Sequence, residues 1–407
     1  MTQKTRLAIL VSHPIQHFVH LYRALALRPE IILTVIFCSR IGVDRYFDKE
    51  MNTNIEWKTD LLSGYDHLFL PEARTITLVS ELTINNPSAT RVLRDLQPNA
   101  VMLYGYNHVT ALRAFLWCKM HGVNVLMTGD GDAVSTRSPL KAIIRNLVLR
   151  RLLSWVSAFL TVGDQNECML ASLGVARHRM FRTPFPIDEA SYLASRNKRA
   201  ETSRGLRAEL AIPESRFVFL FVGKLCARKR PLDLVDAWDA LRQAGGPADR
   251  VHLLFCGEGE QRAALTARIA ETGANSTLAG FVNVDQLPRF FCAADVLVHP
   301  AERDPHPLVC SEAVAIGLPL LLSDKVGLIG PTDIGRQGEN ALVYPSGCVP
   351  DLADAMGLLA LSPEVCKSMG EASLRVYGES DLQAAVGGVM NAIRIHAGGQ
   401  SPASLER

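Results

Sequence analysis

Two carboxylates in the second half of the 407-residue chain stand where they could bind a phosphorylated ligand rich in hydroxyl groups. Asp304 and Glu312 flank Pro307, a residue that fits the first turn of a helix, and the apolar segment 308–316 continues that helix. The amides at a helix N-terminus favour an anion, and carboxylates accept hydrogen bonds from hydroxyl groups. This combination predicts a nucleotide sugar as the ligand.

Two lysines on an earlier loop could complete such a site. Gly223 and Lys224 follow an apolar run, and Lys229 precedes the next predicted helix. Cations on one strand-to-helix loop could neutralise a diphosphate and stabilise its departure. The alternative is a solvated basic loop, but the combination with Asp304 and Glu312 favours a functional site.

Two glycine-containing turns follow in the same half. Gly257, in the segment CGEGE at 256–260, permits close approach of the backbone to a ligand. Gly280 and Phe281, in AGFV at 279–282, could bring backbone groups to a nucleobase. Each turn taken alone also fits an ordinary tight connection between a strand and a helix.

The first half carries neutral hydrogen-bonding groups after its first strand. His13, Gln16 and His17, in SHPIQHF at 12–18, could bind an acceptor hydroxyl or a phosphate. A capping turn with partly exposed histidines explains them equally well. The loop lacks GxGxxG, so the dinucleotide-binding pattern is absent.

Asp130 lies in a second polar loop of the first half, TGDGD at 128–132. One interpretation is a DxD-type site that holds a diphosphate through a divalent cation. In another, Asp130 receives the acceptor's proton or touches the donor sugar. A turn shaped by Gly and Asp is the third. Because lysines already offer charge for the diphosphate, the metal interpretation is the least favoured, and we expect no metal.

Strand-like and helix-like segments alternate along the chain, which predicts an α/β fold with two doubly wound parallel sheets and ligands at the carboxyl ends of their strands. The Arg-rich stretch 194–207 is the expected linker. We therefore expect an acceptor domain over 1–193 and a donor domain over 208–378. A C-terminal helix should return to the first domain within 379–407, with a frayed end from 398. Strands are expected at 7–11, 33–37, 100–103, 125–127, 159–162, 217–222, 251–255, 277–278, 296–298 and 320–322.

Composition narrows the class of protein. The formal charge of +2 gives no reason to expect nucleic acid, and nine scattered cysteines without a CxxC pair indicate reduced thiols in a cytoplasmic protein. No segment reaches the roughly eighteen apolar residues of a spanning helix. One helix, expected at 140–154, could be an exception to an ordinary solvated surface. Its basic residues could lie on the inner face of a plasma membrane as a peripheral contact, although a solvated face is the favoured explanation. These residues are Lys141, Arg145, Arg150 and Arg151.

At these motifs the chain resembles a known family. GKLCARK at 223–229 is similar to the G-R-L-x-x-x-K phosphate loop of retaining GT-B glycosyltransferases of family 4. DPHPLVCSE at 304–312 is similar to the family's E-x7-E signature, and the intervening turns follow in the same order. In the first half, the segment at 12–25 resembles enzymes of this family that make bacterial surface polysaccharides.

The resemblance implies roles for individual residues. Lys224 and Lys229 would neutralise the donor diphosphate, and amides near Leu308 and Val309 would contact it. Glu312 would bind the ribose hydroxyls. Asp304, or Glu302 in its place, would bind the transferred sugar, and Asp130 falls where many relatives carry a histidine that faces that sugar.

The sequence departs from the family pattern at three positions. Asp304 is one methylene shorter than glutamate, Lys224 lacks the bidentate fork of arginine, and Pro307 stands where a glycine often offers an amide.

The resemblance implies a GT-B transferase that needs no cofactor and uses a nucleotide-diphosphate sugar as its donor. Its acceptor would be a hydroxyl of a glycan or a lipid-linked oligosaccharide, in bacterial polysaccharide biosynthesis. Two alternatives remain open. One is a GT-B-fold epimerase or hydrolase of sugar nucleotides, and the other is a non-catalytic subunit for glycan assembly.

Overall fold

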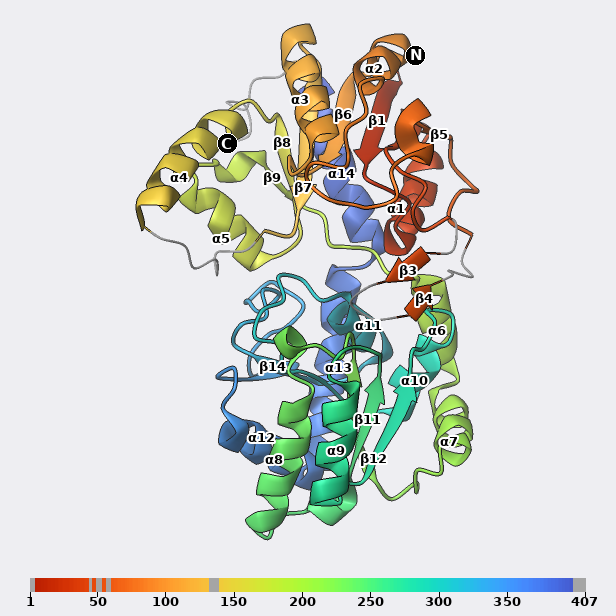
Figure 1. The fold of residues 1–407 in the computed structure, drawn as a ribbon, viewed down its shortest axis with the longest axis vertical. Helices are drawn as coiled ribbons and strands as arrows, with labels where there is room; N and C mark the ends of the chain where they lie inside the picture. Colours follow the sequence, from red (N-terminus) through yellow and green to blue (C-terminus); the bar gives the residue numbers. More distant parts are fainter. Residues whose placement is uncertain (1–3, 44–45, 49–52, 56–59, 132–138, 398–407) are drawn as a thin grey trace. The chain divides into compact units, whose positions relative to one another are not determined.

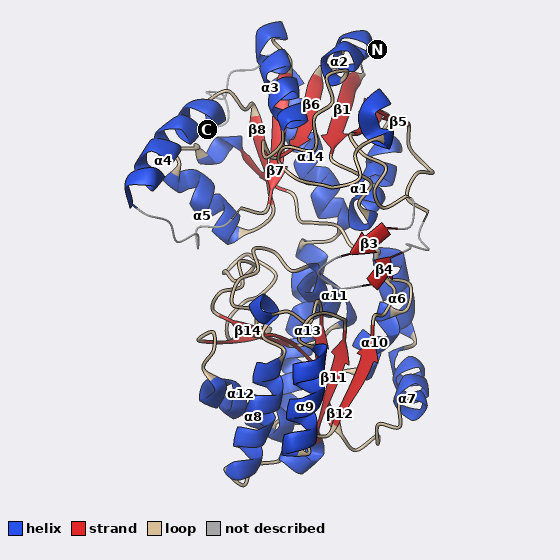
Figure 2. Cartoon of the chain, viewed as in Figure 1, coloured by secondary structure: helices blue, strands red, loops and turns tan. Residues whose placement is uncertain are grey.

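The computed structural model describes residues 4–43, 46–48, 53–55, 60–131 and 139–397, and the chain forms two compact units (Figures 1 and 2). Unit 1 comprises Met1–Tyr46, Thr59–Ile187 and Ser380–Arg407. Unit 2 comprises Phe47–Lys58 and Asp188–Glu379. Each unit is built around its own parallel sheet.

The sheet of unit 1 has the strand order β5-β2-β1-β6-β7-β8-β9, and its strands pair in parallel. Apolar runs form its centre because helices cover both faces, so that Leu7 to Val11 are all buried. The strands are β1 Thr5–Val11, β2 Ile31–Phe37, β5 His67–Phe69, β6 Ala100–Tyr104, β7 Asn124–Gly129, β8 Ala158–Thr161 and β9 Met180–Arg182.

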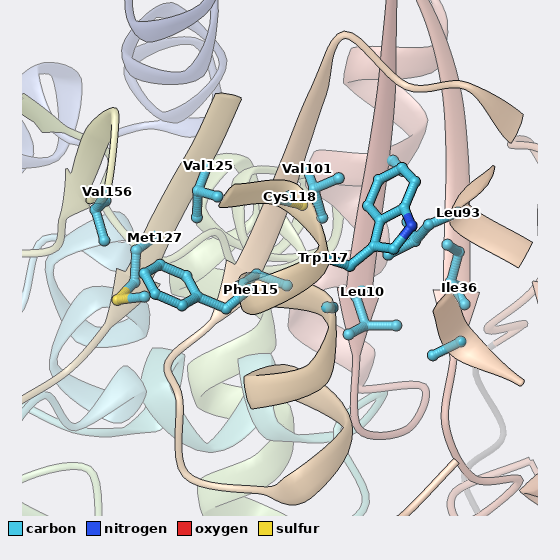
Figure 3. Close-up of a cluster of buried hydrophobic side chains, with 14 of the residues drawn as sticks. Leu10, Ile36, Leu93, Val101, Phe115, Trp117, Cys118, Val125, Met127 and Val156 are labelled. Atoms are coloured by element: carbon cyan, nitrogen blue, oxygen red, sulfur yellow. The ribbon is translucent and has the colours of Figure 1, made fainter. Parts of the chain in front are cut away.

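One face of this sheet packs against α3 (Val109–His121). Phe115 and Cys118 of α3 are buried with Val101 and Met127 from the strands (Figure 3). The other helices of unit 1 are α1 Gln16–Ala26, η1 Pro71–Arg74, α2 Ala89–Leu96, α4 Pro139–Leu153, α5 Asp164–Ser172, η2 Arg177–Arg179 and α14 Leu382–Ala397.

The C-terminal helix α14 returns to unit 1, where it packs on α1, β8 and β9. Gly388 permits this approach, since a Cβ there would overlap the carbonyl oxygen of Arg182 in β9. The expected return of the last helix to the first half is confirmed. The expected frayed end at 398–407 lies outside the described residues.

The sheet of unit 2 has the order β12-β11-β10-β13-β14-β15, again with parallel pairs. Its strands are β10 Phe217–Val222, β11 Val251–Cys256, β12 Ser276–Gly280, β13 Val296–His299, β14 Leu320–Ser323 and β15 Ala341–Tyr344; a separate pair joins β3 Tyr46–Asp48 and β4 Thr53–Ile55. Its helices are α6 Glu189–Asn197, α7 Arg199–Glu209, η3 Ala227–Lys229, α8 Leu232–Gln243, η4 Ala248–Arg250, α9 Arg262–Thr272, α10 Leu287–Ala293, α11 Leu308–Ile316, α12 Val349–Leu361 and α13 Pro363–Glu379.

Two parallel sheets with interleaved helices confirm the predicted α/β class. The expected linker at 194–207 is wrong, because this stretch lies in α6 and α7, and α7 packs on α10. Arg207 is 8% exposed and donates to Asp295 Oδ2 over 2.8 Å and to the carbonyl of Ala293 over 2.9 Å. Within the described residues, no helix is both long and apolar enough to cross a bilayer.

Candidate functional site

The loops after β10, β11 and β12 are joined by backbone hydrogen bonds at the carboxyl end of the unit 2 sheet. The amide of Gly223 donates to the carbonyl of Cys256 over 3.0 Å, and the amide of Gly257 donates to that of Gly280 over 2.8 Å. The amide of Leu225 likewise donates to the carbonyl of Glu258 over 2.9 Å. The segments that carry the predicted phosphate loop and both glycine turns are therefore neighbours.

The close contact between two of these loops requires a glycine at position 257. Its φ is +156°, and a Cβ at this position would overlap the carbonyl oxygen of Gly223. The close approach that the structure displays is thus between two protein backbones. Approach of a ligand to Gly257, or of a nucleobase to Gly280 and the half-buried Phe281, stays a prediction.

Lys229 and Asp304 meet directly, although 75 positions separate them in the chain. Lys229 Nζ contacts Asp304 Oδ2, and His299 Nε2 lies 2.8 Å from the same oxygen. The exposed fractions of these side chains are 13%, 12% and 1%, respectively. The two loops that the sequence placed in one site therefore share a buried carboxylate.

Asp304 is held in its ionised form. Burial would raise the pKa of this carboxyl, but the hydrogen bond from His299 and the positive charge of Lys229 outweigh that effect and hold the pKa well below its usual range. Burial lowers the pKa of His299, so the imidazole is neutral and its Nε2–H donates to the carboxylate. The site thus combines a fixed negative charge with the Lys229 ammonium.

Neighbouring backbone fixes the loop that carries Asp304. The amide of Glu302 donates to the carbonyl of Arg228, and the Arg228 guanidinium donates to the carbonyl of Arg303, each over 2.8 Å. The amide of Gly327, after β14, donates to the carbonyl of Asp304 over 2.8 Å. Asp304 is thus positioned by two loops of unit 2, while Glu302 stays exposed.

The N-terminus of α11 lies directly after this loop. Leu308 begins the helix, as predicted, and no side chain in the described part of the chain caps it. Leu308 and Val309 are half-buried, so their amides belong to a partly open helix end. Uncapped amides of this kind can bind an anion. Lys224 is also half-buried, on the loop after β10.

Glu312 lies on α11, in surroundings unlike those of Asp304. Burial raises the pKa of Glu312 to about 7; the nearby Tyr192 hydroxyl of α6 opposes the rise, and the negative charge of Asp188 adds to it. Sequence reasoning missed Tyr192, because it lies outside the predicted donor domain. It also missed His299, although this histidine ends a buried strand next to the predicted site.

A hollow of about 1270 Å³ borders the outer side of the phosphate loop, between that loop and α9. Cys226, Arg228 and Thr266 are among the residues that line it. Lys229, Asp304 and Glu312 are not part of its lining, so this hollow is distinct from the predicted donor site.

Unit 1 holds the residues predicted for the acceptor side. His13 follows β1, and its Nδ1 lies 2.8 Å from Ser12 Oγ, within hydrogen-bond distance. Burial lowers the pKa of this imidazole to about 4. Gln16 begins α1, and its buried Oε1 has no hydrogen-bond partner among the described residues. The His17 ring lies 5.8 Å from that of Phe185. A neutral histidine and an orphaned amide oxygen therefore lie near the carboxyl end of β1.

Asp130 is exposed after β7. Its DxD partner, Asp132, lies outside the described residues. Among the residues that the structure describes, no group of three or more His, Cys, Asp or Glu side chains is arranged to hold a metal ion.

Comparison with known proteins finds a family match for the second half of the chain. Residues 203–376 match the profile of the family "Glycosyl transferases group 1". The D-inositol 3-phosphate glycosyltransferase of Arthrobacter sp. (strain FB24) is 31% identical over 170 residues, which cover 41% of this chain and 40% of that protein. The chain thus spans less than half the length of this curated relative.

Solved structures extend the likeness to the whole fold. A glycosyltransferase from Rickettsia africae aligns with a TM-score of 0.73 at 12% identity, over 98% of this chain and 100% of that one. HepE of Anabaena, in complex with UDP and glucose, aligns with a TM-score of 0.69 at 14% identity, over 96% and 99%. The structure therefore has the two-sheet GT-B fold of these proteins, and the family match supports a glycosyltransferase of group 1.

Proposed function

We propose that this protein is a retaining glycosyltransferase of family 4 that uses a nucleotide-diphosphate sugar. The contact of Lys229 with Asp304, beside the uncapped end of α11, carries the proposal, because it gathers cationic, anionic and amide groups at one strand edge. Several relatives are named as glycosyltransferases, which favours transfer over epimerisation, hydrolysis or a non-catalytic role.

Different groups of this site would bind the diphosphate, the ribose and the base of the donor. Lys224, Lys229 and the amides of Leu308 and Val309 would bind the diphosphate, and Glu312 would accept hydrogen bonds from the ribose. Backbone groups at Gly280 and Phe281 would meet the base. HepE, which shares the fold, has a crystal structure in complex with UDP and glucose.

Asp304 would bind the transferred sugar through its second oxygen. Lys229 and His299 both contact Oδ2, and no partner of Oδ1 occurs among the described residues. A sugar hydroxyl could therefore donate to Oδ1 without displacing either neighbour. This arrangement favours Asp304 over the exposed Glu302 as the sugar ligand, and it compensates for the shorter side chain by fixing its position.

The reaction would take place on one face of the sugar. The bond from the sugar's anomeric carbon to the acceptor oxygen forms on the face where the bond to the phosphate oxygen breaks. The departing phosphate oxygen takes the acceptor's proton. Lys229 stabilises the charge that develops on the diphosphate. On this scheme the chain needs neither a metal nor a cofactor.

The acceptor would be a hydroxyl of a glycan or a lipid-linked oligosaccharide, in the synthesis of a bacterial surface polysaccharide, and it would meet His13, Gln16, His17 and Asp130. We place the protein in the cytoplasm, since all nine of its cysteines are free thiols.

Lys229→Ala tests the proposal. A donor found by thermal-shift screening of UDP-, GDP- and ADP-sugars would be supplied with an acceptor, and turnover measured. Loss of one transition-state cation should lower kcat about 10²-fold or more. Lys367→Ala, an exposed lysine of α13, is the matched control and should leave turnover unchanged. A folded Lys229→Ala variant with near wild-type turnover would sink the assignment.

A further inference from the structure

Two helices of unit 1, α3 and α4, together carry six Lys and Arg residues and no Asp or Glu. Such an imbalance is unusual for surface helices, which normally mix both signs. Arg113 and Lys119 lie on α3, and Arg150 and Arg151 are the described basic side chains of α4; all four are exposed. The outward sides of these helices therefore present positive charge without intervening carboxylates.

Large apolar side chains are exposed between these charges. Leu112, Leu116 and Met120 recur every four residues, which places them on one side of α3, and they are 38%, 50% and 75% exposed. On α4, Leu147 and Val148 are 71% and 61% exposed. Single exposed leucines are ordinary, but a helical stripe of three that faces solvent is uncommon in a soluble surface.

Trp155, which follows α4, joins the two helices. Lys119 Nζ of α3 lies 5.6 Å from its ring centroid, and the Arg151 guanidinium of α4 lies 5.5 Å from it. The ring also stacks on Phe115 of α3, with 6.3 Å between centroids. Val148 shares a side of α4 with Arg151, three residues away. One tryptophan ring thus has two cations within 6 Å of its centroid, one from each helix. The exposed apolar residues lie on these same two helices.

The hollow beneath this ring extends the basic character. It has a volume of about 310 Å³ and is lined by Lys119, Trp155, His178 and Arg179, among others. The Arg179 guanidinium donates to the carbonyl of Leu153, the last residue of α4, and to the carbonyl of Val156 just after it. Lys119 and the exposed His178 remain directed toward solvent at its rim.

We infer that this α3–α4 face, composed of Leu112, Leu116, Lys119, Met120, Val148, Arg151 and Trp155, docks on an anionic lipid bilayer. Apolar side chains flanked by cations and an amphipathic tryptophan match a membrane interface, where acyl chains lie beneath negative headgroups. A second protein with an acidic surface is disfavoured because the exposed apolar stripe follows a single helix, α3, at regular spacing. The surface lies outside the proposed donor site. Only its use in reaching a lipid-linked acceptor rests on the proposed function.

The test is co-sedimentation of the full chain with vesicles of phosphatidylcholine alone or mixed with phosphatidylglycerol, at low and high salt. Wild-type protein should bind the mixed vesicles at low salt, dissociate from them at high salt and show no binding to neutral vesicles. Lys119→Glu/Arg151→Glu should lower the partition coefficient at least about tenfold. Leu116→Ser/Met120→Ser should reduce the binding that remains at high salt.

Matched variants separate this face from general charge and apolarity. Lys367→Glu/Arg375→Glu on α13 removes the same net charge from exposed sites of unit 2, and Leu358→Ser on α12 removes an exposed leucine. Both should bind vesicles as the wild type does. Equal loss in these controls, or no dependence on phosphatidylglycerol, would overturn the inference. A dimer in light scattering that Leu116→Ser/Met120→Ser dissolves would overturn it too, since the face would then bind a second copy.

Donor binding by thermal shift serves as an independent readout. The α3–α4 variants should keep it, which also shows that they are folded. If the wild type bound vesicles but no nucleotide sugar, the proposed function would fail while the docking surface stood.

Discussion

His299 Nε2 lies 2.8 Å from Asp304 Oδ2, within a site where the histidine side chain is only 1% exposed. The neutral imidazole donates to the carboxylate from its buried side, and Lys229 contacts the same oxygen. One oxygen of Asp304 is thereby fixed, and the proposed function assigns the other to the donor sugar. His299 is thus a positioning residue for Asp304, and in the proposed donor site it would act on donor binding only through that carboxylate.

Removal of this hydrogen bond should loosen the carboxylate. We expect His299→Ala to lower the free energy of unfolding by about 1.5–3 kcal/mol, as for other hydrogen bonds to charged groups. It should also raise the pKa of Asp304, so that the acid limb of the kcat/KM profile for the donor moves to higher pH when measured in the Glu312→Gln background, where residue 312 no longer titrates. Denaturant unfolding and a pH–rate profile measure the two effects.

Rescue by glutamine distinguishes positioning from packing. The amide nitrogen of Gln reaches about as far as His Nε2, so His299→Gln should restore the acid limb, whereas His299→Leu fills volume without a donor and should not. If Leu and Gln behaved alike, the role assigned to this histidine would be refuted.

Gly257→Ala should disrupt the loop contacts at the carboxyl edge of the unit 2 sheet, because the added Cβ overlaps the Gly223 carbonyl. Gly273→Ala is a matched control: Gly273 also has positive φ, +72°, but a Cβ there meets no atom within 4 Å. The control should cost about 1 kcal/mol for backbone strain alone. Gly257→Ala should cost several times more, as measured by urea unfolding; equal costs would contradict the contact.

The central strands of both sheets could be predicted because they are apolar runs buried on two faces, and such runs stand out in the sequence. The edge strands β5, β9 and β15 were not predicted, since each is short and only partly buried. The meeting of Lys229 with Asp304 was also accessible, since parallel strands end at one edge of a sheet. The role of Gly257 was not, because a glycine that permits contact between two loops looks the same in sequence as one that admits a ligand.

Arg-rich helices were the least predictable part of the fold. The stretch 194–207 resembles a solvated linker by composition, yet Arg207 is buried by donating to carbonyls and to Asp295. Whether an arginine faces water or backbone oxygen depends on tertiary partners that no local pattern encodes. The same holds for Tyr192, which reaches Glu312 from a helix outside the predicted donor domain.

Arg207→Ala therefore tests whether α7 is an integral part of unit 2. The substitution removes donors from a buried cluster and leaves Asp295 without its cation, so we expect a loss of about 2–4 kcal/mol in unfolding free energy. Arg289 offers a matched control at the same α7–α10 packing, since it pairs with Glu209 over 2.6 Å at the surface. Arg289→Ala should cost at most about 1 kcal/mol. Similar losses for both variants would show that 194–207 contributes no buried anchor.

Glu312 predicts a pH dependence of stability. Burial raises its folded-state pKa to about 7, above the ordinary value of 4.5, so the folded protein holds this proton more tightly than the unfolded chain. The stability that Glu312 contributes is therefore largest at low pH and falls as pH rises through about 7. In Glu312→Gln this contribution is absent. The wild-type unfolding free energy, minus that of the variant, should fall between about pH 5 and pH 8 and should not rise.

The same titration should govern donor binding. In the proposed donor site, an ionised Glu312 would accept hydrogen bonds from both ribose hydroxyls, whereas the protonated form offers fewer acceptor sites. Nucleotide-sugar affinity should thus increase as pH rises through about 7, while the diphosphate diester keeps a constant charge. Calorimetric titration should show this increase in the wild type and a flat, weaker profile in Glu312→Gln. A wild-type affinity that is constant across this range would remove Glu312 from the ribose site, and a matching slope in the variant would assign the titration to another group.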